Sequence, residues 1–294
     1  MNTCVEQANA KINLFLDVIG RRADGYHLID GVMQTVTLAD RVSVGFEPAE
    51  KIGITLTARG NDAMPTDMNN LACRAAKRYL EAANIGGSVS IGIEKNIPMA
   101  AGLAGGSADA AAVLRALDRL SGARLGTDAL CRLGATLGAD VPFCVRGGAM
   151  RTEGIGDRLT PCAGLSGCFL VVACAGNGVS TPWAYAEIDA RSGGLFPASE
   201  TAGKVEKLIH ALQIRNWENA CAGMENIFES VVPSVNPFVN RIKTILRGAG
   251  AAHAMMSGSG PSVFGVFFRE ADARSACETL AAAGIGGRLC QPVL

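Results

Sequence analysis

A glycine-rich stretch at residues 98–112 has the composition of a phosphate-binding loop. It reads PMAAGLAGGSADAAA, so closely spaced glycines are followed by residues of high helix propensity. Glycine has no Cβ and lets the main chain approach a ligand closely. Ser107 is expected to cap the following helix, with Asp109 as an acidic residue in its first turn. Because a glycine loop that enters a helix N-terminus binds anions, we predict a phosphate site here.

Two common phosphate-binding motifs are excluded, and one alternative stays open. A P-loop needs a lysine directly after its last glycine, whereas Ser107 and Ala108 follow Gly106. The GxGxxG fingerprint of dinucleotide-binding folds is absent as well. The alternative is a flexible glycine and alanine connector, but a connector needs no capped helix at its exit.

The loop at residues 20–27 places an aromatic residue beside an imidazole. It begins with a glycine, carries a second one near its end, and finishes with Tyr26 and His27. A tyrosine ring can stack on a flat heterocycle, and a histidine can hydrogen-bond to the polar edge of that heterocycle. A solvated turn between two strands is the alternative, and the residues alone leave both interpretations open.

Asp140 and Lys11 are candidates for a catalytic pair. Asp140 follows the expected end of a helix and precedes an apolar run that we expect to be a strand, so we expect its carboxylate to be buried. A buried carboxylate needs a partner. Lys11 interrupts a mainly apolar strand at residues 10–16 and is the best candidate. A helix N-cap or a structural ion pair is the alternative for Asp140.

The composition is that of a globular protein. The chain has 294 residues, of which 49% are hydrophobic and 18% are charged, which excludes a disordered chain. Lys+Arg and Asp+Glu are both 27, so no nucleic-acid partner is expected. The apolar runs are short and the first contains charges, so we expect neither a membrane segment nor a signal peptide. The cysteines form no CxxC pair, which is typical of reduced cysteines in a cytoplasmic protein.

Hydrophobic periodicity predicts strands and helices in two domains. We expect strands near residues 4–19, 32–46, 52–58, 88–94, 168–173, 252–256 and 263–268, and a last strand at the C-terminus. We expect helices after residues 67–70, from Ser107 and Thr127, after a Thr181 cap, and near 203–213, 217–230, 237–247 and 270–283. Residues 192–202 read as a connector. A change of composition near 153–167 separates a domain at 1–158 from one at 159–294.

Four stretches of the chain resemble the motifs of the GHMP small-molecule kinases. They are residues 8–14, 98–111, 138–143 and 256–262, and together with the loop at 20–27 they extend over nearly the whole chain. The loop with Asp-Gly-Tyr-His and the stretch Gly-Ala-Asp-Val-Pro-Phe are most similar to the branch of that family that acts on a cytidyl-diphosphate methylerythritol.

The resemblance implies a fold, a reaction and its cofactors. The fold would be α+β, with an N-terminal domain like ribosomal protein S5, a ferredoxin-like C-terminal domain, and an active site in the cleft between them. The reaction would be the ATP-dependent phosphorylation of the 2-hydroxyl of the cytidyl-diphosphate methylerythritol, with Mg²⁺ as cofactor. This step belongs to the non-mevalonate route to isoprenoid precursors. We expect a monomer or weak homodimer in the cytoplasm, with no nucleic-acid or membrane partner.

The resemblance also implies roles for individual residues. Lys11 and Asp140 would be catalytic, and Ser107 would contact phosphate-bound Mg²⁺. Residues expected at the substrate are Asn13, Tyr26, His27, Thr181 and Tyr185. Residues expected at ATP are Asn69, Pro98, Met99, Ala100, Ala101, Gly102, Leu103, Ala104, Gly105, Gly106, Ser107 and Ala108.

The phosphate loop departs from the family pattern PMGGGLGGGSSDAA at four positions. Ala100, Ala101 and Ala104 replace glycines, and Ala108 replaces the second serine. Alanine is compatible with these positions where the backbone φ is negative. The loss of the second hydroxyl leaves Ser107 as the only side-chain oxygen of the loop for phosphate or Mg²⁺.

Two rival functions remain. Another GHMP kinase, such as a mevalonate or homoserine kinase, is disfavoured by Tyr26 and His27, because those acceptors carry no heterocycle. A nucleotide-binding regulator that has lost catalysis is disfavoured by the presence of both Lys11 and Asp140.

Overall fold

The computed structural model describes residues 2–60, 63–193 and 203–294, which form two compact units. Unit 1 contains the described residues of 1–10, 39–99 and 104–147, and unit 2 contains those of 11–38, 100–103 and 148–294. Two long strands, β1 (Asn2–Arg21) and β2 (His27–Pro48), contribute residues to both units.

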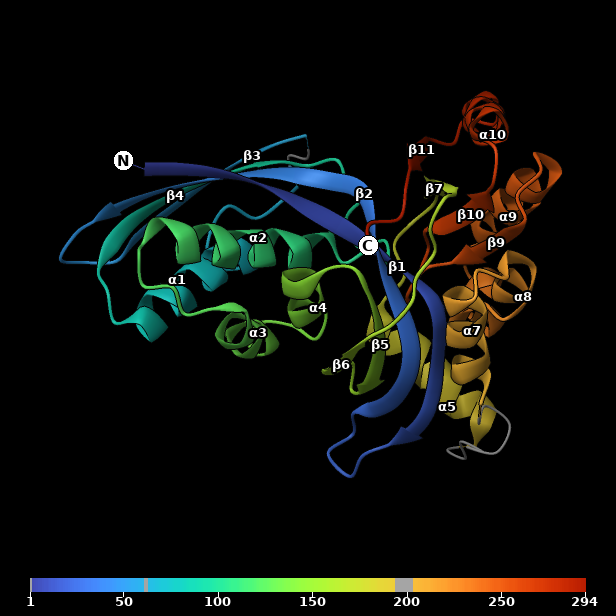
Figure 1. Ribbon diagram of the computed structural model, residues 1–294, viewed down its shortest axis with the longest axis horizontal. Coiled ribbons are helices and arrows are strands. Elements are labelled where there is room, and N and C mark those ends of the chain that lie inside the picture. The colour runs from blue at the N-terminus through green and yellow to red at the C-terminus, as the bar shows by residue number, and fades with distance from the viewer. Residues whose placement is uncertain (1, 61–62, 194–202) are drawn as a thin grey trace. The chain divides into compact units, whose positions relative to one another are not determined.

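Unit 1 packs helices against a sheet. Its strands follow the order β3 (Gly53–Arg59), β4 (Gly87–Glu94), β2 and β1, with β3 parallel to β4 and β4 antiparallel to β2. Its helices are α1 (Leu71–Ala83), α2 (Gly105–Leu120), α3 (Thr127–Ala135) and α4 (Val141–Arg146). Figure 1 shows α1 and α2 lying side by side against these strands. Apolar residues that alternate along β4 are buried in the same core as the alanine-rich face of α2.

Unit 2 contains the rest of the strands and helices. β1 and β2 belong to one seven-stranded sheet, whose unit 2 strands follow the order β8 (Glu225–Asn226), β1, β2, β5 (Ala149–Gly154) and β6 (Arg158–Pro161). The other is antiparallel, in the order β11 (Gly287–Cys290), β7 (Phe169–Ala173), β10 (Val263–Phe267) and β9 (His253–Met256). Its helices are α5 (Thr181–Ser192), α7 (Lys204–Gln213), α8 (Trp217–Ala222), α9 (Phe238–Gly248) and α10 (Glu270–Ala282). In Figure 1, α9 and α10 lie beside the antiparallel sheet.

The strands expected from hydrophobic periodicity and most of the expected helices are confirmed, and the fold is α+β. The strand expected directly after Asp140 is wrong, because that segment forms α4. The continuous helix expected at 217–230 is wrong: α8 ends before Gly223, and β8 and the short 3₁₀ helix η1 (Ile227–Ser230) follow. Asn226 holds the segment after α8 in this conformation, because its side chain accepts a hydrogen bond from Phe228 N at the start of η1 and donates to Met256 O and Gly258 O. Of the expected connector at 192–202, Ser192 belongs to α5, and residues 194–202 lie outside the described residues.

No helix in the described part of the chain is both long and apolar enough to span a bilayer. None of the ten cysteines, all of which the structure describes, is in a disulfide.

Candidate functional site

The expected phosphate site lies at the N-terminus of α2. The helix begins at Gly105, and its N-cap is Ala104, which has left-handed backbone angles (φ 56°, ψ 29°) and provides no side-chain cap. The expectation that Ser107 caps this helix is therefore wrong. The left-handed turn at Ala104 places the N-cap three residues earlier than expected, so that Gly105, Gly106 and Ser107 belong to the first turn. The first N–H groups of α2 have no carbonyl partner within the helix.

The two glycines of this turn have different surroundings. A Cβ added at Gly105 would lie 3.0 Å from Ile97 Cγ2 and 3.3 Å from Lys95 Nζ, so this position is closely packed. Gly106 is exposed, and a Cβ there would meet only Leu71 Cδ1, at 3.8 Å. Leu71 is the first residue of α1, so the start of α1 lies close to the start of α2. Asn69 is near this point and exposed, and its side-chain amide donates to Asp67 Oδ2 at 3.0 Å.

The alanines that replace family glycines fall into two classes. Ala100 and Ala104 have positive φ, 50° and 56°, whereas Ala101 and Ala108 are not among the residues with positive φ. A left-handed conformation costs a non-glycine residue roughly 1–2 kcal/mol. Negative φ, the condition under which alanine is compatible with the loop, is therefore met at Ala101 and Ala108 and not at the other two positions.

A buried group of charges, which we call the Lys95 cluster, lies under the start of α2. Lys95 Nζ donates to Asp40 Oδ2 and to Asp109 Oδ2, the latter at 2.8 Å. All three side chains are at least nine-tenths buried. Asp109 was expected in the first turn of this helix, but the helix begins at Gly105 and has no acidic residue in its first turn. Burial, opposed by the charge of Lys95, raises the pKa of Asp109 to about 7.

Asp140 stands at the start of α4. The strand that we expected after it is this short helix, with Asp140 at its N-cap position and Pro142 within the first turn. The carboxylate was expected to be buried, but the residue is only half-buried. A Cβ added at Gly138, two residues earlier, would lie 4.0 Å from Ser107 Oγ. The segment that carries Asp140 thus approaches the first turn of α2.

In unit 2, Lys11 and Asn13 are buried on β1. Lys11 Nζ donates to Asn13 Oδ1 at 2.6 Å, and the two side chains belong to residues only 4% and 3% exposed. The turn at 257–262 lies next to them, because a Cβ on Gly258 would be 3.4 Å from Lys11 Nζ. Ser257 Oγ accepts from Asn13 N at 3.3 Å and donates to Gly102 O at 3.1 Å. The turn at 257–262, which is the second glycine-rich turn of the chain, therefore holds Gly102 of the phosphate loop beside Lys11.

The Tyr26 loop also belongs to unit 2. Arg22 N donates to Tyr26 O at 2.7 Å, which closes a tight turn that leaves Tyr26 59% exposed. His27 stacks on Tyr185 of α5, with ring centroids 4.5 Å apart and an interplanar angle of 21°. His27 Nε2 lies 2.7 Å from Asp189 Oδ1. The expected aromatic and imidazole groups of the substrate site are thus brought together within this unit.

Thr181 lies at the start of α5 and is exposed. Its hydroxyl is 2.8 Å from Ser259 Oγ in the second glycine-rich turn. The N-cap of α5 is Ser180 rather than Thr181, because Ser180 Oγ accepts from Trp183 N and Pro182 occupies the second helical position.

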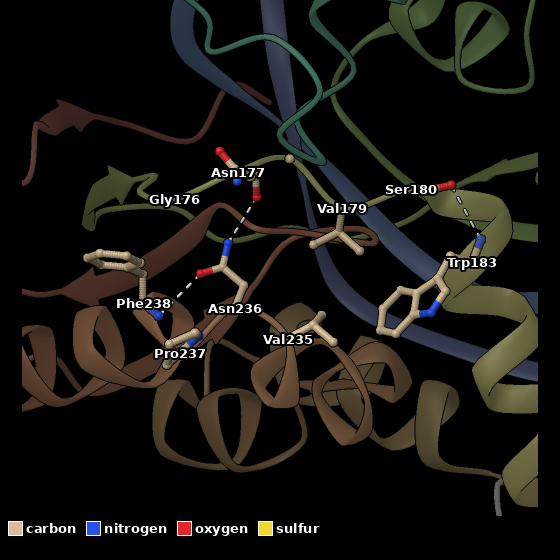
Figure 2. Close-up of a pocket in the computed structure, with 10 residues that line it drawn as sticks. Gly176, Asn177, Val179, Ser180, Trp183, Val235, Asn236, Pro237 and Phe238 are labelled. Atoms are coloured by element: carbon tan, nitrogen blue, oxygen red, sulfur yellow. Dashed lines mark hydrogen bonds between the residues drawn. The ribbon is translucent and has the colours of Figure 1, made fainter.

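A pocket of about 550 Å³ opens between the start of α5 and the start of α9 (Figure 2). Trp183, Val179 and Val235 form apolar walls, and none of the expected site residues lines it. Its central polar side chain, Asn236, donates to Asn177 O at 3.0 Å and accepts from Phe238 N at 3.2 Å. The side chain of Asn236 thus links the segment at 176–180 to the start of α9.

Sequence reasoning missed Lys95, Asp40 and Asp189. Lys95 directly follows the alternating apolar residues of β4, which was a usable signal for a buried cation. Asp189 lies four residues after Tyr185, so the two share one face of α5. Lys95 and Asp40 are 55 residues apart in the sequence, and Asp189 and His27 are 162 residues apart. No local sequence pattern links the members of either pair.

Mg²⁺ is the metal that the family resemblance implies. Among the residues that the structure describes, no group of three or more His, Cys, Asp or Glu could hold a metal ion. Ser107 offers a half-buried hydroxyl in the first turn of α2. This fits Mg²⁺, which often keeps water and substrate phosphates as most of its ligands.

Comparison with known proteins identifies the family of this chain. The GHMP kinases N terminal domain model matches residues 70–148, and the GHMP kinases C terminal model matches residues 208–286. A 4-diphosphocytidyl-2-C-methyl-D-erythritol kinase from Bacillus pumilus (strain SAFR-032) is 42% identical over 262 residues, which cover 89% of this chain and 87% of the relative. One from Alkaliphilus metalliredigens (strain QYMF) is 39% identical over 274 residues, covering 93% and 91%.

Solved structures give the same result. A crystal structure of 4-(cytidine 5'-diphospho)-2C-methyl-D-erythritol kinase superposes with a TM-score of 0.77 at 36% identity, covering 98% of this chain and 99% of the other. A homoserine kinase from Cytophaga hutchinsonii reaches a TM-score of 0.76 at 18% identity, covering 100% and 95%, and so shares the fold. With this identity and coverage, the chain belongs to the 4-diphosphocytidyl-2-C-methyl-D-erythritol kinase family of the ATP-dependent GHMP kinases.

Proposed function

We propose that this protein transfers the γ-phosphoryl group of ATP to the 2-hydroxyl of 4-diphosphocytidyl-2-C-methyl-D-erythritol, a step in the non-mevalonate route to isoprenoid precursors. The family gives the kinase class and ATP. The observation that carries the choice of acceptor is the group formed by Tyr26, His27 and Tyr185. It combines an exposed aromatic ring with a stacked imidazole, which suits a nucleobase. Mevalonate and homoserine have no ring for this group to bind.

The first turn of α2 would bind the β- and γ-phosphates of ATP. Its N–H groups and the positive end of the helix dipole point at one place, and Gly106 leaves that place open. Asn69, at the neighbouring start of α1, would contact the nucleotide. Phosphoryl transfer asks the protein mainly for positioning and charge neutralisation, which this arrangement supports.

Asp140 and Lys11 would act on the acceptor hydroxyl. The half-buried carboxylate of Asp140 would accept the hydroxyl proton as phosphoryl transfer proceeds. The buried ammonium of Lys11 would stabilise the negative charge that develops on that oxygen, and its bond to Asn13 would fix its position. The acceptor is a tertiary alcohol, so its orientation should matter more than its intrinsic nucleophilicity.

Mg²⁺ would be held by the phosphates of ATP together with Ser107. When bound, it neutralises part of the phosphate charge. We further propose that the protein works in the cytoplasm as a monomer or weak homodimer, and that its functional domains divide near residue 158. Ten cysteines without a disulfide support a reducing compartment.

An ADP-release assay with a panel of acceptors tests this function. The panel contains 4-diphosphocytidyl-2-C-methyl-D-erythritol, its uridine analogue, methylerythritol phosphate, mevalonate and homoserine. We expect the cytidyl acceptor to have the highest kcat/KM, and product analysis by NMR to place the new phosphate on the 2-oxygen. Equal use of methylerythritol phosphate would exclude nucleobase recognition. Absence of ADP release with every acceptor would favour the regulator that has lost catalysis.

A further inference from the structure

Asp189 connects two elements of unit 2 at the proposed nucleobase site. One carboxylate oxygen is 2.7 Å from His27 Nε2, and the other is 3.1 Å from Arg21 Nη1. Arg21 ends β1 and His27 begins β2, so the carboxylate spans the base of the turn that presents Tyr26. Arg21 Nε also donates to Gly25 O at 3.2 Å, within the same turn.

The imidazole of His27 is fixed in both plane and rotation. Its plane is set by stacking on Tyr185, whose ring packs edge-on against Phe228 with centroids 4.9 Å apart. Its rotation within that plane is set by the contact with Asp189. The side chain of His27 is only 10% exposed, so alternative rotamers have little room. The chemical identity of the two ring nitrogens therefore depends on Asp189.

A carboxylate can only accept hydrogen bonds, so the ring nitrogen that faces Asp189 carries the proton. In the neutral ring this leaves Nδ1 as a hydrogen-bond acceptor. Cytosine presents an amino group, a donor, at the position where uracil presents a carbonyl oxygen, an acceptor. A ring whose acceptor nitrogen is fixed can thus prefer cytosine over uracil.

We propose that Asp189 is a positioning residue that sets the tautomer of His27 and thereby the preference for a cytidine acceptor. This inference rests on the proposed function, because it assumes that His27 reads the base. Arg21 has a defined part in it: by donating to the second oxygen, Arg21 keeps the carboxylate turned toward both partners.

The variant Asp189→Asn gives a directional test. Arg21 can only donate, so the amide is expected to turn its oxygen to Arg21 and its NH₂ group to His27. The ring would then carry its proton on Nδ1 and become a donor toward the base. We expect the ratio of kcat/KM for the cytidyl and uridyl acceptors to fall at least ~10-fold, through a higher KM for the cytidyl acceptor, with kcat changed less than ~3-fold.

The state of the ring can be read without any substrate. Nitrogen-15 NMR of the free protein distinguishes the two tautomers, and the spectrum of His27→Ala assigns the signal among the three histidines. We expect the Nε2–H form in the wild type and a shift toward Nδ1–H in Asp189→Asn. Glu187→Gln, on the same helix, removes an equal charge and is expected to change neither readout.

The outcomes separate this inference from the proposed function. An unchanged ring signal in Asp189→Asn would overturn the positioning role, whatever the kinetics. An unchanged cytidyl-to-uridyl ratio in Asp189→Asn, with a lowered ratio in His27→Ala, would overturn the link from Asp189 to specificity. A wild type that uses methylerythritol phosphate as well as the cytidyl acceptor would overturn the proposed function, and the NMR result would still decide the role of Asp189 at the ring.

Discussion

Two charged clusters of the molecule have inverse composition and different burial. The Lys95 cluster places one cation between two carboxylates, and its side chains are 4%, 0% and 2% exposed for Lys95, Asp40 and Asp109. The second cluster places one carboxylate, that of Asp189, between Arg21 and His27. Its side chains are 22%, 53% and 10% exposed in that order.

The difference in burial predicts a difference in use. A charge held away from water must keep its partners, because an unpaired buried charge costs several kcal/mol. The Lys95 cluster is therefore suited to fixing the start of α2, which must present its N–H groups in one geometry. The cluster around Asp189 keeps contact with water, so its members can change at small cost to folding. A substitution in the cluster around Asp189 is therefore expected to change ligand selection more than folding.

The largest expected effect follows from removing Lys95. Lys95→Met leaves Asp40 and Asp109 facing each other without their cation, and we expect a loss of about 3–5 kcal/mol in the free energy of unfolding. Arg21→Met, which removes the exposed cation of the other cluster, should cost about 0–1 kcal/mol. Urea unfolding followed by circular dichroism measures both. Losses of equal size would remove the distinction between the clusters.

Asp140→Asn tests the catalytic role of a carboxylate that lies outside both clusters. Asp140 is half-buried, so we expect little change in the urea midpoint. If it accepts the hydroxyl proton, kcat should fall by ~10² or more, the usual range for an acid–base group. Nucleotide affinity should stay close to that of the wild type. Asp128→Asn, at an exposed aspartate of unit 1, serves as the control. Turnover near the wild-type value would remove Asp140 from the mechanism.

The pH dependence of stability gives the next effect. The pKa of Asp109 is raised from 3.8 to about 7 by burial, so between these values the folded state binds a proton that the unfolded state releases. This group therefore stabilises the fold at low pH, and its contribution declines as the pH rises toward 7.

Asp109→Asn removes that titration. The free energy of unfolding of the wild type, taken relative to the variant, should fall with rising pH by at most ~1.4 kcal/mol per unit between about pH 4 and pH 7. Urea midpoints at several pH values measure this difference. Parallel curves for the two proteins would contradict the raised pKa of Asp109.

The site could be predicted from the sequence where its signals are local. The glycine spacing at 98–112 and the adjacent Tyr26 and His27 are contiguous, and the structure places each in a turn beside a helix N-terminus or an aromatic partner. The helix start at Gly105 could not be predicted, because glycine and alanine propensities do not reveal a left-handed Ala104. Asp189 and Lys95 have partners brought near only by the tertiary fold. Pairs that are distant in the sequence produce no hydrophobic periodicity from which the contact could be predicted.

The smallest expected effect concerns the backbone that leads into the Lys95 cluster. Ala104 has a φ of 56°, where its Cβ is strained, and glycine is the residue that adopts this conformation freely. Ala104→Gly removes the strain but also gives the unfolded chain more freedom, so we expect a net gain of about 0.5–1 kcal/mol in the free energy of unfolding. Ala108→Gly, in the interior of α2, should instead lose about 1 kcal/mol. Thermal unfolding of the two variants beside the wild type measures the opposite signs. A loss of stability in Ala104→Gly would mean that the contacts of the Ala104 methyl group outweigh its backbone strain. Packing of that methyl group would then stabilise the left-handed turn, in addition to the ion pairs of the Lys95 cluster.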